Sequence, residues 1–388
     1  MKIKVGFLAS SFVNRHGSGT GKHFAIVTKM LCEDFNSQVE VTLFCNNHDQ
    51  VLALKKDQSY HKANLVLFPS VKGNWLRSSR QYFKYALTSR RDKIDVVHFS
   101  VPRLYPFFWL FPAKKFVCTF HAGGDITSEK DSFILSREVY NLSAKIFFRK
   151  LNAIIAVSEF GKNEISEAYG IPRQLINVMH VGTDDVWKSN LNLAKSHSKP
   201  KKKLLVVIGR WQKFKNVQVV SDALAKANHS DLSEFFFVFV GKKISSNAKI
   251  INEHLVDLDN ELYKTIEYLD DDSYASIISE ADLVIVPSLN EGFSHPVFDA
   301  FSFGARLLIH SPSPAAEILV AKKGVLAADL SHSNNMLNLI NEALAMPKSN
   351  LVDNRLFLNS IEATWGHLTK NYLKLYLDLK NNLRNLDH

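Results

Sequence analysis

Short apolar runs alternate with helix-length segments along the whole chain. In the first half, the runs suited to β-strands are 3–9, 39–45, 96–99, 116–120 and 153–157. In the second half they are 204–208, 235–240, 283–286 and 306–309. Runs that are apolar throughout, without alternation, indicate sheets covered on both faces. The pattern therefore predicts two doubly wound α/β domains.

Helical repeats and a polar interruption complete this division. Segment 20–34 places its apolar residues at helical spacing, so it can cover one face of a sheet, and 365–383 reads as one long amphipathic helix that closes the fold. Residues 184–203 have little periodicity and end in a lysine-rich run, which is typical of an exposed linker. We expect an N-terminal domain at 1–183, the linker at 184–203, a second domain at 204–364 and the closing helix at 365–388.

Composition excludes several classes of protein. The chain has 388 residues, of which 46% are hydrophobic, so it can bury sizeable cores. Its longest apolar run, 104–113, contains two prolines and is too short to cross a bilayer. The first residues read as a strand and lack the features of a signal peptide, so we expect a cytoplasmic protein. Its three cysteines, Cys32, Cys45 and Cys118, are widely spaced, which favours buried, reduced thiols over disulfides or a zinc site.

Positive charge is concentrated in the first half. Residues 1–183 hold 25 Lys and Arg against 14 Asp and Glu, whereas the remainder holds 23 against 24. Such an uneven field attracts nucleic acid, anionic lipid or a phosphorylated substrate. The stretch 75–93 mixes Arg77, Arg80 and Lys84 with aromatic residues, as interfacial helices do, and a lipid-linked acceptor would explain it. An ordinary amphipathic helix packed on the first sheet explains it equally well.

A glycine-rich loop follows the first strand. Gly17, Gly19 and Gly21 precede a helix, the setting in which backbone N–H groups bind phosphate. The loop is not a Walker A motif, because His16 and His23 stand where that motif needs Gly and Ser or Thr. A generic tight turn is the alternative.

Two cations follow the first strand of the second domain. Gly209, Arg210 and Lys215 lie in a segment expected at the carboxyl end of the sheet, where ligands of doubly wound domains bind. Arg210 offers a planar fork and Lys215 a point charge, a pair suited to a diphosphate that leaves in a reaction. A solvated basic turn is the alternative.

The sharpest signal is the segment 287–299. It follows a predicted buried strand, and Pro296 marks the first turn of a helix flanked by Glu291 and Asp299. These carboxylates could bracket a ligand whose phosphate sits on the helix N-terminus, or they could simply complement the helix dipole. Two other acidic clusters, 270–272 and 184–185, read as a helix cap and part of the linker rather than as metal sites.

Together these motifs occur in a characteristic order. They are the glycine loop at 17–21, Thr119-Phe120-His121-Ala122, Val157-Ser158-Glu159, His180-Val181-Gly182-Thr183-Asp184, Gly209-Arg210 with Lys215, and the stretch from Glu291 to Gly304. In this order the sequence resembles the family 4 glycosyltransferases of the GT-B fold, over nearly the whole chain. The resemblance implies two Rossmann-like domains facing a cleft, with the C-terminal helix packed back on the N-terminal domain. It also implies transfer of a sugar from a nucleotide diphosphate sugar with retention of anomeric configuration, without a metal or other cofactor.

The resemblance further implies roles for individual residues. Arg210 and Lys215 would hold the donor diphosphate and stabilise it as leaving group, Glu291 would bind hydroxyls of the donor sugar, and His121 resembles the family histidine at the reaction centre. The donor site would also include Gly19, Gly209, Gly292, Phe293, Ser294 and Asp299, and the acceptor or membrane side Gly17, Arg77, Arg80 and Lys84. Two positions depart from the family pattern: Asp299 replaces a glutamate that binds the ribose diol, and Ser294 stands where glycine is common.

A purely structural interpretation of His121 is the alternative, in which it is an imidazole at a strand end with its hydrogen bonds satisfied. Its place at a carboxyl strand end before Gly123 and Gly124, which allow a ligand to approach closely, favours the functional interpretation.

The sequence thus predicts a cytoplasmic, retaining hexosyltransferase that uses a nucleotide diphosphate sugar and a glycan or lipid-linked acceptor. Bacterial surface polysaccharide, such as lipopolysaccharide, O-antigen or capsule, is the expected setting, with peripheral attachment to an anionic inner membrane surface as a further hypothesis. One alternative is another GT-B enzyme, such as a sugar-nucleotide epimerase or a phosphorylase. The other is a nucleic-acid-binding protein, although no zinc spacing or aromatic RNA-binding motif accompanies the charge.

Overall fold

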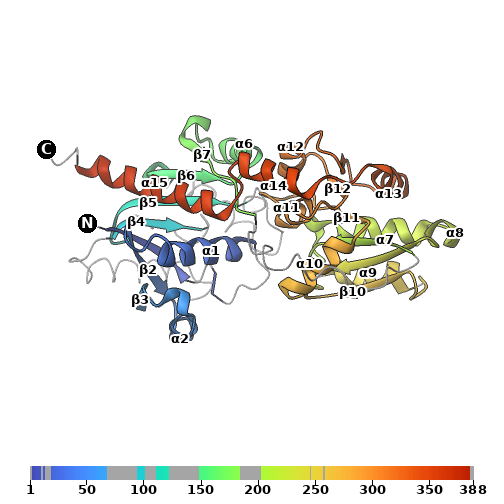
Figure 1. The fold of residues 1–388 in the computed structure, drawn as a ribbon, viewed down its shortest axis with the longest axis horizontal. Helices are drawn as coiled ribbons and strands as arrows, with labels where there is room; N and C mark the ends of the chain where they lie inside the picture. The colour runs from blue at the N-terminus through green and yellow to red at the C-terminus, as the bar shows by residue number, and fades with distance from the viewer. Residues whose placement is uncertain are drawn as a thin grey trace. The chain divides into compact units, whose positions relative to one another are not determined.

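Two compact units make up the chain in the computed structural model (Figure 1). The first contains Met1–Gly182 and Glu362–His388, and the second contains Thr183–Ile361. The structure describes residues 2–9, 12–13, 19–67, 94–100, 111–121, 148–183, 202–244, 246–256 and 258–384. Most of the expected linker lies outside these residues, as do Gly17 and the whole of the basic stretch 75–93.

A parallel sheet forms the centre of the first unit. Its described strands are β1 (Ile3–Leu8), β2 (Val39–Cys45), β3 (Asn64–Leu67), β4 (Ile94–Phe99), β5 (Ala113–Phe120), β6 (Ala153–Ala156) and β7 (Ile176–Val178), in the order β3-β2-β1-β4-β5-β6-β7. The helices are α1 (Gly19–Glu33), α2 (His48–Lys56), α6 (Glu159–Tyr169) and α15 (Trp365–Arg384). The strand order reverses between β1 and β4, and ligands of doubly wound sheets bind at the carboxyl ends beside such a reversal.

The second unit repeats this topology. Its described strands are β8 (Lys203–Ile208), β9 (Phe235–Val240), β10 (Tyr263–Ile266), β11 (Leu283–Val286), β12 (Leu307–His310) and β13 (Val325–Ala328), in the order β10-β9-β8-β11-β12-β13. The helices are α7 (Val217–Lys226), α8 (His229–Leu232), α9 (Ser246–Val256), α10 (Asp271–Glu280), α11 (His295–Ser302), α12 (Pro314–Ile318), α13 (Met336–Ala345) and α14 (Leu351–Ser360). Here the order reverses between β8 and β11, and the two parallel sheets confirm the predicted fold class.

The strands that the sequence pattern missed are all at sheet edges. Every predicted strand is an interior strand, whereas β3, β7, β10 and β13 close the edges of the two sheets. These edge strands have three or four residues each and are partly exposed. An edge strand has one neighbour and needs no continuous apolar run, so periodicity gives little signal for it.

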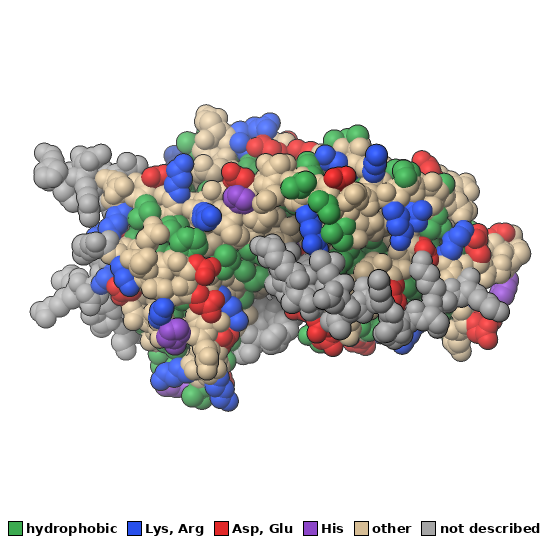
Figure 2. Space-filling view, viewed as in Figure 1, with side chains coloured by type: hydrophobic (Ala, Val, Ile, Leu, Met, Phe, Trp, Pro, Cys, Tyr) green, Lys and Arg blue, Asp and Glu red, His purple; other side chains and the backbone are tan. Residues whose placement is uncertain are grey.

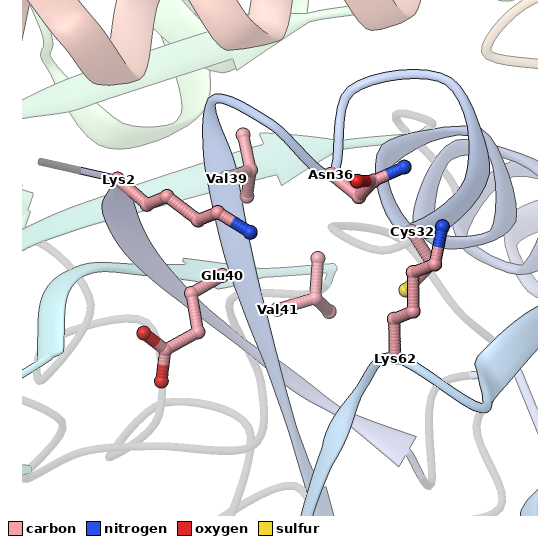
Figure 3. Close-up of a pocket in the computed structure, with 7 residues that line it drawn as sticks. All are labelled: Lys2, Cys32, Asn36, Val39, Glu40, Val41 and Lys62. Atoms are coloured by element: carbon pink, nitrogen blue, oxygen red, sulfur yellow. The ribbon is translucent and has the colours of Figure 1, made fainter.

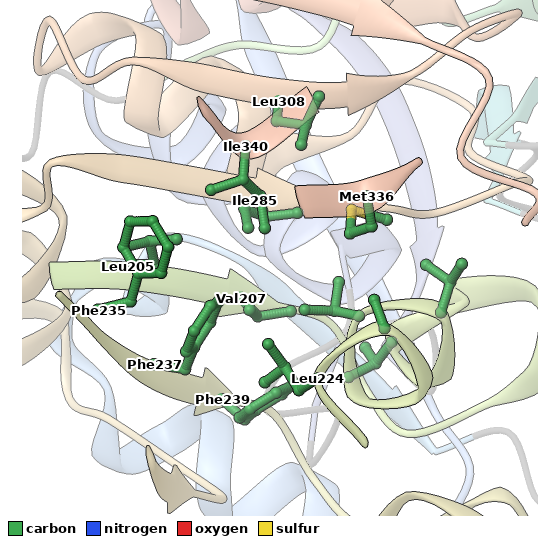
Figure 4. Close-up of a cluster of buried hydrophobic side chains, with 14 of the residues drawn as sticks. Leu205, Val207, Leu224, Phe235, Phe237, Phe239, Ile285, Leu308, Met336 and Ile340 are labelled. Carbon is green, nitrogen blue, oxygen red and sulfur yellow. The ribbon is translucent and has the colours of Figure 1, made fainter. Parts of the chain in front are cut away.

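Three phenylalanines of β9 lie in the core of the second unit, among mostly aliphatic side chains (Figure 4). Phe235, Phe237 and Phe239 are alternate residues of β9 and point to the same side of the sheet, where each is at most 1% exposed. They pack with Leu205 and Val207 of β8 and with side chains of α7 and α13. The intervening Val238 and Val240 are also buried, so both faces of β9 are covered, as its uniformly apolar sequence predicts.

The C-terminal helix belongs to the first unit. Helix α15 contacts α1, β1 and β4, and Figure 1 shows it running along that sheet. Its inward face carries Leu368, Tyr372 and Tyr376, which are all buried. Near its end, Nζ of Lys380 lies 3.1 Å from the carboxylate of Asp95 at the start of β4. The predicted return of this helix to the N-terminal domain is confirmed.

A chain of buried hydrogen bonds joins α15 to the sheet and to α1. The hydroxyl of Tyr376 lies 2.5 Å from Nδ1 of His98 on β4, and Nε2 of His98 lies 2.7 Å from Oγ1 of Thr119 on β5. Thr119 lies 3.1 Å from the hydroxyl of Tyr372, which in turn lies 3.0 Å from Nε2 of His23 on α1. All five side chains are at most 1% exposed. Because buried polar groups are costly to leave unpaired, the chain specifies how α15 sits on this unit.

Gly182 is in close contact with the start of α15, which gives a stability prediction. A Cβ at Gly182 would lie 2.6 Å from Cα of Trp365, a distance that requires the backbone to move. At Gly366, the residue after Trp365, a Cβ would meet nothing within 4 Å. We expect Gly182→Ala to lower the free energy of unfolding by about 2 kcal/mol or more, and Gly366→Ala to raise it by up to about 1 kcal/mol. Urea denaturation measures the free energy of unfolding of both variants. Equal changes in the two variants would contradict a close contact at Gly182.

His98 gives the structure a predictable response to acid. Burial holds the pKa of His98 well below its ordinary value, and the neighbouring His121 lowers it further. Below about pH 6.5 the unfolded chain therefore binds a proton that folded His98 does not, so the stability present at neutral pH is lost as the pH falls.

We expect His98→Gln to reduce this loss. Between pH 6.5 and 5, the free energy of unfolding should fall less steeply with falling pH in the variant than in the wild type. We expect the two slopes to differ by about 1 kcal/mol per pH unit. The measurement is urea denaturation at several pH values, in which the slope matters and the absolute stability does not. Parallel pH dependences would show that His98 titrates normally in the folded protein.

Candidate active site

Two loops meet at the carboxyl edge of the second sheet. Strands β8 and β11 are parallel neighbours, so the segments that follow them, 209–216 and 287–294, leave the sheet at the same edge. The backbone N–H of Leu289 donates to the carbonyl of Phe214 at 2.9 Å, and the hydroxyl of Ser288 donates to the same carbonyl at 3.3 Å. No sequence pattern marks the contact between Ser288 and Phe214, because it exists only once β8 pairs with β11.

This junction brings together two of the predicted site residues. Nζ of Lys215 lies 2.5 Å from Oε1 of Glu291, and the two side chains are 16% and 15% exposed. Lys215 also lies over the ring of Phe214, with Nζ 5.3 Å from the ring centroid. Both side chains are largely shielded from water, which strengthens their attraction, and both keep some exposed surface.

Arg210 and Gly209 occupy the end of β8 beside this pair. Arg210 is exposed, and it leaves a second positive charge at this edge of the sheet. Gly209 is tightly packed, since a Cβ there would lie 2.9 Å from Cγ2 of Val217 at the start of α7. The backbone carbonyl of Gly209 is also covered closely by Gly241 after β9. Glycine at 209 therefore has a packing reason that needs no ligand.

The N-terminus of α11 follows Glu291 directly. Gly292, Phe293 and Ser294 are buried, and Pro296 stands in the first turn, as predicted. Ser294 has φ 72° and ψ 69°, a left-handed conformation that favours glycine, which explains why glycine is common at this position. Its Oγ is buried and has no hydrogen-bond partner among the described residues. A strained residue with a buried, unpaired hydroxyl marks this loop as a functional candidate.

Asp299 differs from Glu291 in environment. It lies within α11 and is 5% exposed. The pKa of the Tyr274 phenol is raised, mainly by burial and further by the negative charge of Asp299, so the two side chains are electrostatic neighbours. Only the fold reveals this neighbour of Asp299, since Tyr274 is on α10.

His121 belongs to the first unit, at the carboxyl end of β5. Burial lowers its pKa to about 3, so the imidazole is neutral at physiological pH. Its ring meets that of His23 edge-on, with 4.7 Å between centroids, and that of Phe24 at 5.7 Å. Its Nε2 is buried without a hydrogen-bond partner among the described residues. The alternative of a satisfied strand-end imidazole leaves this unpaired nitrogen unexplained, and the role of His121 in the reaction stays a prediction.

The other predicted residues of the first unit are only partly covered. Gly19 is the exposed first residue of α1. Gly17, Arg77, Arg80 and Lys84 lie outside the described residues. On the face shown in Figure 2, the described Lys and Arg side chains are interspersed with Asp and Glu and do not form one basic patch.

The described residues hold no cluster of three or more His, Cys, Asp or Glu suited to a metal ion. Asp270 caps α10 by accepting a hydrogen bond from the N–H of Ser273 at 2.7 Å, the role predicted from its sequence. Cys32, Cys45 and Cys118 are buried thiols and do not form disulfides with one another, as expected.

A small pocket lies away from the predicted site residues (Figure 3). It is lined by Lys2 and Val39, at the amino ends of β1 and β2, and by Cys32 and Lys62. None of its lining residues was predicted to act in binding or catalysis. Ligands of parallel sheets bind at the opposite, carboxyl edge, where His121 lies in this unit.

Comparison with solved structures supports the fold throughout. A glycosyltransferase from Rickettsia africae ESF-5 superposes with a TM-score of 0.71 at 16% identity, covering 97% of this chain and 98% of that one. HepE from Anabaena, solved in complex with UDP, gives 0.63 at 15% identity and covers 100% and 99%. WaaG, a glycosyltransferase involved in lipopolysaccharide biosynthesis, gives 0.62 at 14% identity and covers 98% and 99%. At these identities the likeness establishes the fold alone.

Sequence families assign the activity class. No curated protein matches the chain in sequence. Among the described helices, none is both long and apolar enough to cross a membrane. The family described as Glycosyltransferase Family 4 matches residues 24–186, and the family described as Glycosyl transferases group 1 matches residues 189–353. With this pair of domains on two doubly wound sheets, the chain belongs to the family 4 glycosyltransferases of the GT-B fold.

Proposed function

We propose that the second unit binds a nucleotide diphosphate sugar at the carboxyl ends of β8 and β11. The ion pair between Lys215 and Glu291 is the observation that carries this proposal, because it places a cation and a hydroxyl-binding carboxylate side by side at the edge where ligands bind. Lys215 and the exposed Arg210 bind the diphosphate, and Glu291 accepts hydrogen bonds from hydroxyls of the sugar.

Charge explains how these residues assist the reaction. As the glycosidic bond to phosphate breaks, negative charge grows on the leaving diphosphate, and fixed cations stabilise that charge without reorganisation. The guanidinium of Arg210 can bind two phosphate oxygens at once, whereas Lys215 supplies a point charge. Because Glu291 already holds the lysine in place, we infer that Lys215 meets the phosphate from a defined position.

The start of α11 completes the proposed donor site. Gly292 to Ser294 form the loop that leads into the N-terminus of α11, where the helix dipole favours anions, so we propose that their backbone N–H groups bind phosphate and sugar oxygens. The unpaired hydroxyl of Ser294 gives this chain an additional polar group there. Asp299 takes the ribose diol in place of the family glutamate.

The first unit supplies His121 and the acceptor site in this proposal. A neutral imidazole cannot balance phosphate charge, so His121 acts by hydrogen bonding to a substrate hydroxyl and orienting it. Gly19, the first residue of α1, contributes to the donor site in this proposal, and Gly17 contributes to the acceptor side. The acceptor is a glycan or a lipid-linked glycan, and the setting is bacterial surface polysaccharide assembly. WaaG, whose fold this chain shares, acts in lipopolysaccharide biosynthesis, which supports that setting.

Substitution of the two cations tests the donor site. We expect Arg210→Ala and Lys215→Ala each to lower kcat/KM by about 100-fold or more, since each removes stabilisation of charge that develops in the transition state. Lys213→Ala is the matched control, because Lys213 is an exposed cation in the same short turn, Lys213–Lys215. Donors are screened by thermal shift with UDP, GDP, ADP and their sugars, starting with UDP because HepE binds it.

Two outcomes would contradict the proposed donor site. One is that no nucleotide raises the melting temperature, and the other is that the two variants and the Lys213 control have the same activity. We also propose that protein cations take the place of a metal ion in the reaction. The rate of sugar transfer should therefore be unchanged in excess EDTA. Inhibition by EDTA that Mg²⁺ or Mn²⁺ reverses would overturn that part of the proposal alone.

Membrane docking is a separate proposal, supported by the excess of positive charge in residues 1–183. We expect the protein to sediment with anionic vesicles at low salt and to be released at high salt, because each cation near the surface contributes about 1 kcal/mol that salt screens. Replacing Arg77, Arg80 and Lys84 together with Gln should weaken sedimentation, and zwitterionic vesicles are the control. Sedimentation that is absent, or unchanged by salt, would reject docking.

A further inference from the structure

We propose that His23 and Tyr372 are positioning residues for His121: the Tyr372 hydroxyl holds the ring of His23, and that ring fixes the orientation of the His121 imidazole. The C-terminal helix thereby takes part in shaping the candidate active site of the first unit. This inference rests on the proposed role of His121 in binding substrate. None of these links is visible in the sequence, where the three residues are 98 and 251 positions apart along the chain.

Ring contacts hold His121 in the described structure. Its imidazole meets the ring of His23 at 4.7 Å between centroids and at an interplanar angle of 89°, and that of Phe24 at 5.7 Å and 71°. Its Nε2 is buried without a hydrogen-bond partner among the described residues, so no hydrogen bond in this part of the chain orients it through that atom. In the described structure the rings of His23 and Phe24 face this imidazole, and His23 is the closer of the two.

His23 is itself held from several sides. Its ring stacks on that of Phe24, with 4.8 Å between centroids, and meets the indole of Trp365 edge-on at 5.9 Å. Its Nε2 lies 3.0 Å from the hydroxyl of Tyr372, and both side chains are fully buried. Rotation of His23 would break this hydrogen bond where no water is available to replace it, so the bond selects one ring orientation.

Proton counting shows why Tyr372 is the decisive hydroxyl. In the chain from Tyr376 through His98, Thr119 and Tyr372 to His23, each neutral group brings one proton and can accept another. The chain is satisfied when all donors point in the same direction, and Tyr372 is the member that bonds His23 directly. Tyr372 is a central member with partners on both sides, whereas Tyr376 is at one end and is bonded to His98.

This asymmetry supplies a matched pair of variants. Tyr372→Phe and Tyr376→Phe each remove one fully buried hydroxyl from α15 and preserve an aromatic ring. If the hydrogen bonds serve only to attach the helix, both variants lose stability and the folded fraction of each has normal activity. If Tyr372 positions His121, only Tyr372→Phe changes the environment and the function of His121.

The first measurement is NMR of the imidazole nitrogens in protein labelled with ¹⁵N-histidine. The signal of His121, among those of the 15 histidines, is identified by its absence in His121→Ala. We expect its ring resonances to shift in Tyr372→Phe and to be unchanged in Tyr376→Phe. Unchanged His121 resonances in Tyr372→Phe, or equal shifts in both variants, would overturn the proposal whatever the activity.

The second measurement is the steady-state release of UDP from UDP-glucose. We expect Tyr372→Phe to lower kcat by about tenfold with little change in KM, because displacing a positioned group by a small distance costs rate rather than binding. In a His121→Ala background the same substitution should have no further effect, since it acts through His121. An undiminished effect in that background would overturn the proposed route.

These two readouts separate the inference from the proposed function. If His121→Ala retains full activity, the proposed role of His121 fails, while the shift of its resonances still decides whether Tyr372 positions its ring. If Tyr372→Phe does not fold, His23→Phe replaces it, because that variant removes the same hydrogen bond from the other partner and preserves a ring against His121. We then expect the same shift of the His121 resonances, and unchanged resonances would contradict the proposal.

Discussion

Parallel strand pairing at the centre of each sheet is the constraint on which the rest of the structure depends. Parallel neighbours place the loops that follow them at the same edge, so pairing of β8 with β11 makes the Phe214 and Glu291 segments meet. In the first unit, pairing of β4 with β5 brings His98 beside Thr119 in the same way. The strands can pair so only because both faces are covered by apolar contacts, which explains why their sequences are apolar throughout.

Burial then gives polar residues in the two units different properties. Lys215 and Glu291 form an ion pair, and both side chains retain some exposure. His98 and His121 are enclosed, and burial lowers both of their pKa values. Among these residues, the second unit therefore contributes an ion pair, whereas the two histidines of the first unit are neutral hydrogen-bonding groups.

Local conformation adds a third contribution at α11. A serine at φ 72° is less stable than a glycine would be, and its hydroxyl has no partner among the described residues. Both features oppose folding, and both lie beside the ion pair that carries the proposed donor site. Strain at such a position is consistent with selection for binding rather than for stability.

The sequence by itself determined the fold class, the interior strands, the return of the C-terminal helix and the positions of Arg210, Lys215, Glu291 and His121. It could do so because interior parallel strands are continuous apolar runs and because loops after them occupy fixed motif positions. Only the tertiary structure decided what these residues touch. The edge strands have no continuous apolar run, because they bury too little apolar surface to require one. The chain from Tyr376 to His23, and the contact of His23 with His121, arise when α15 packs back on a sheet formed by residues far earlier in the chain. Contacts between distant segments have no local periodicity, so no reading of neighbouring residues can reveal them.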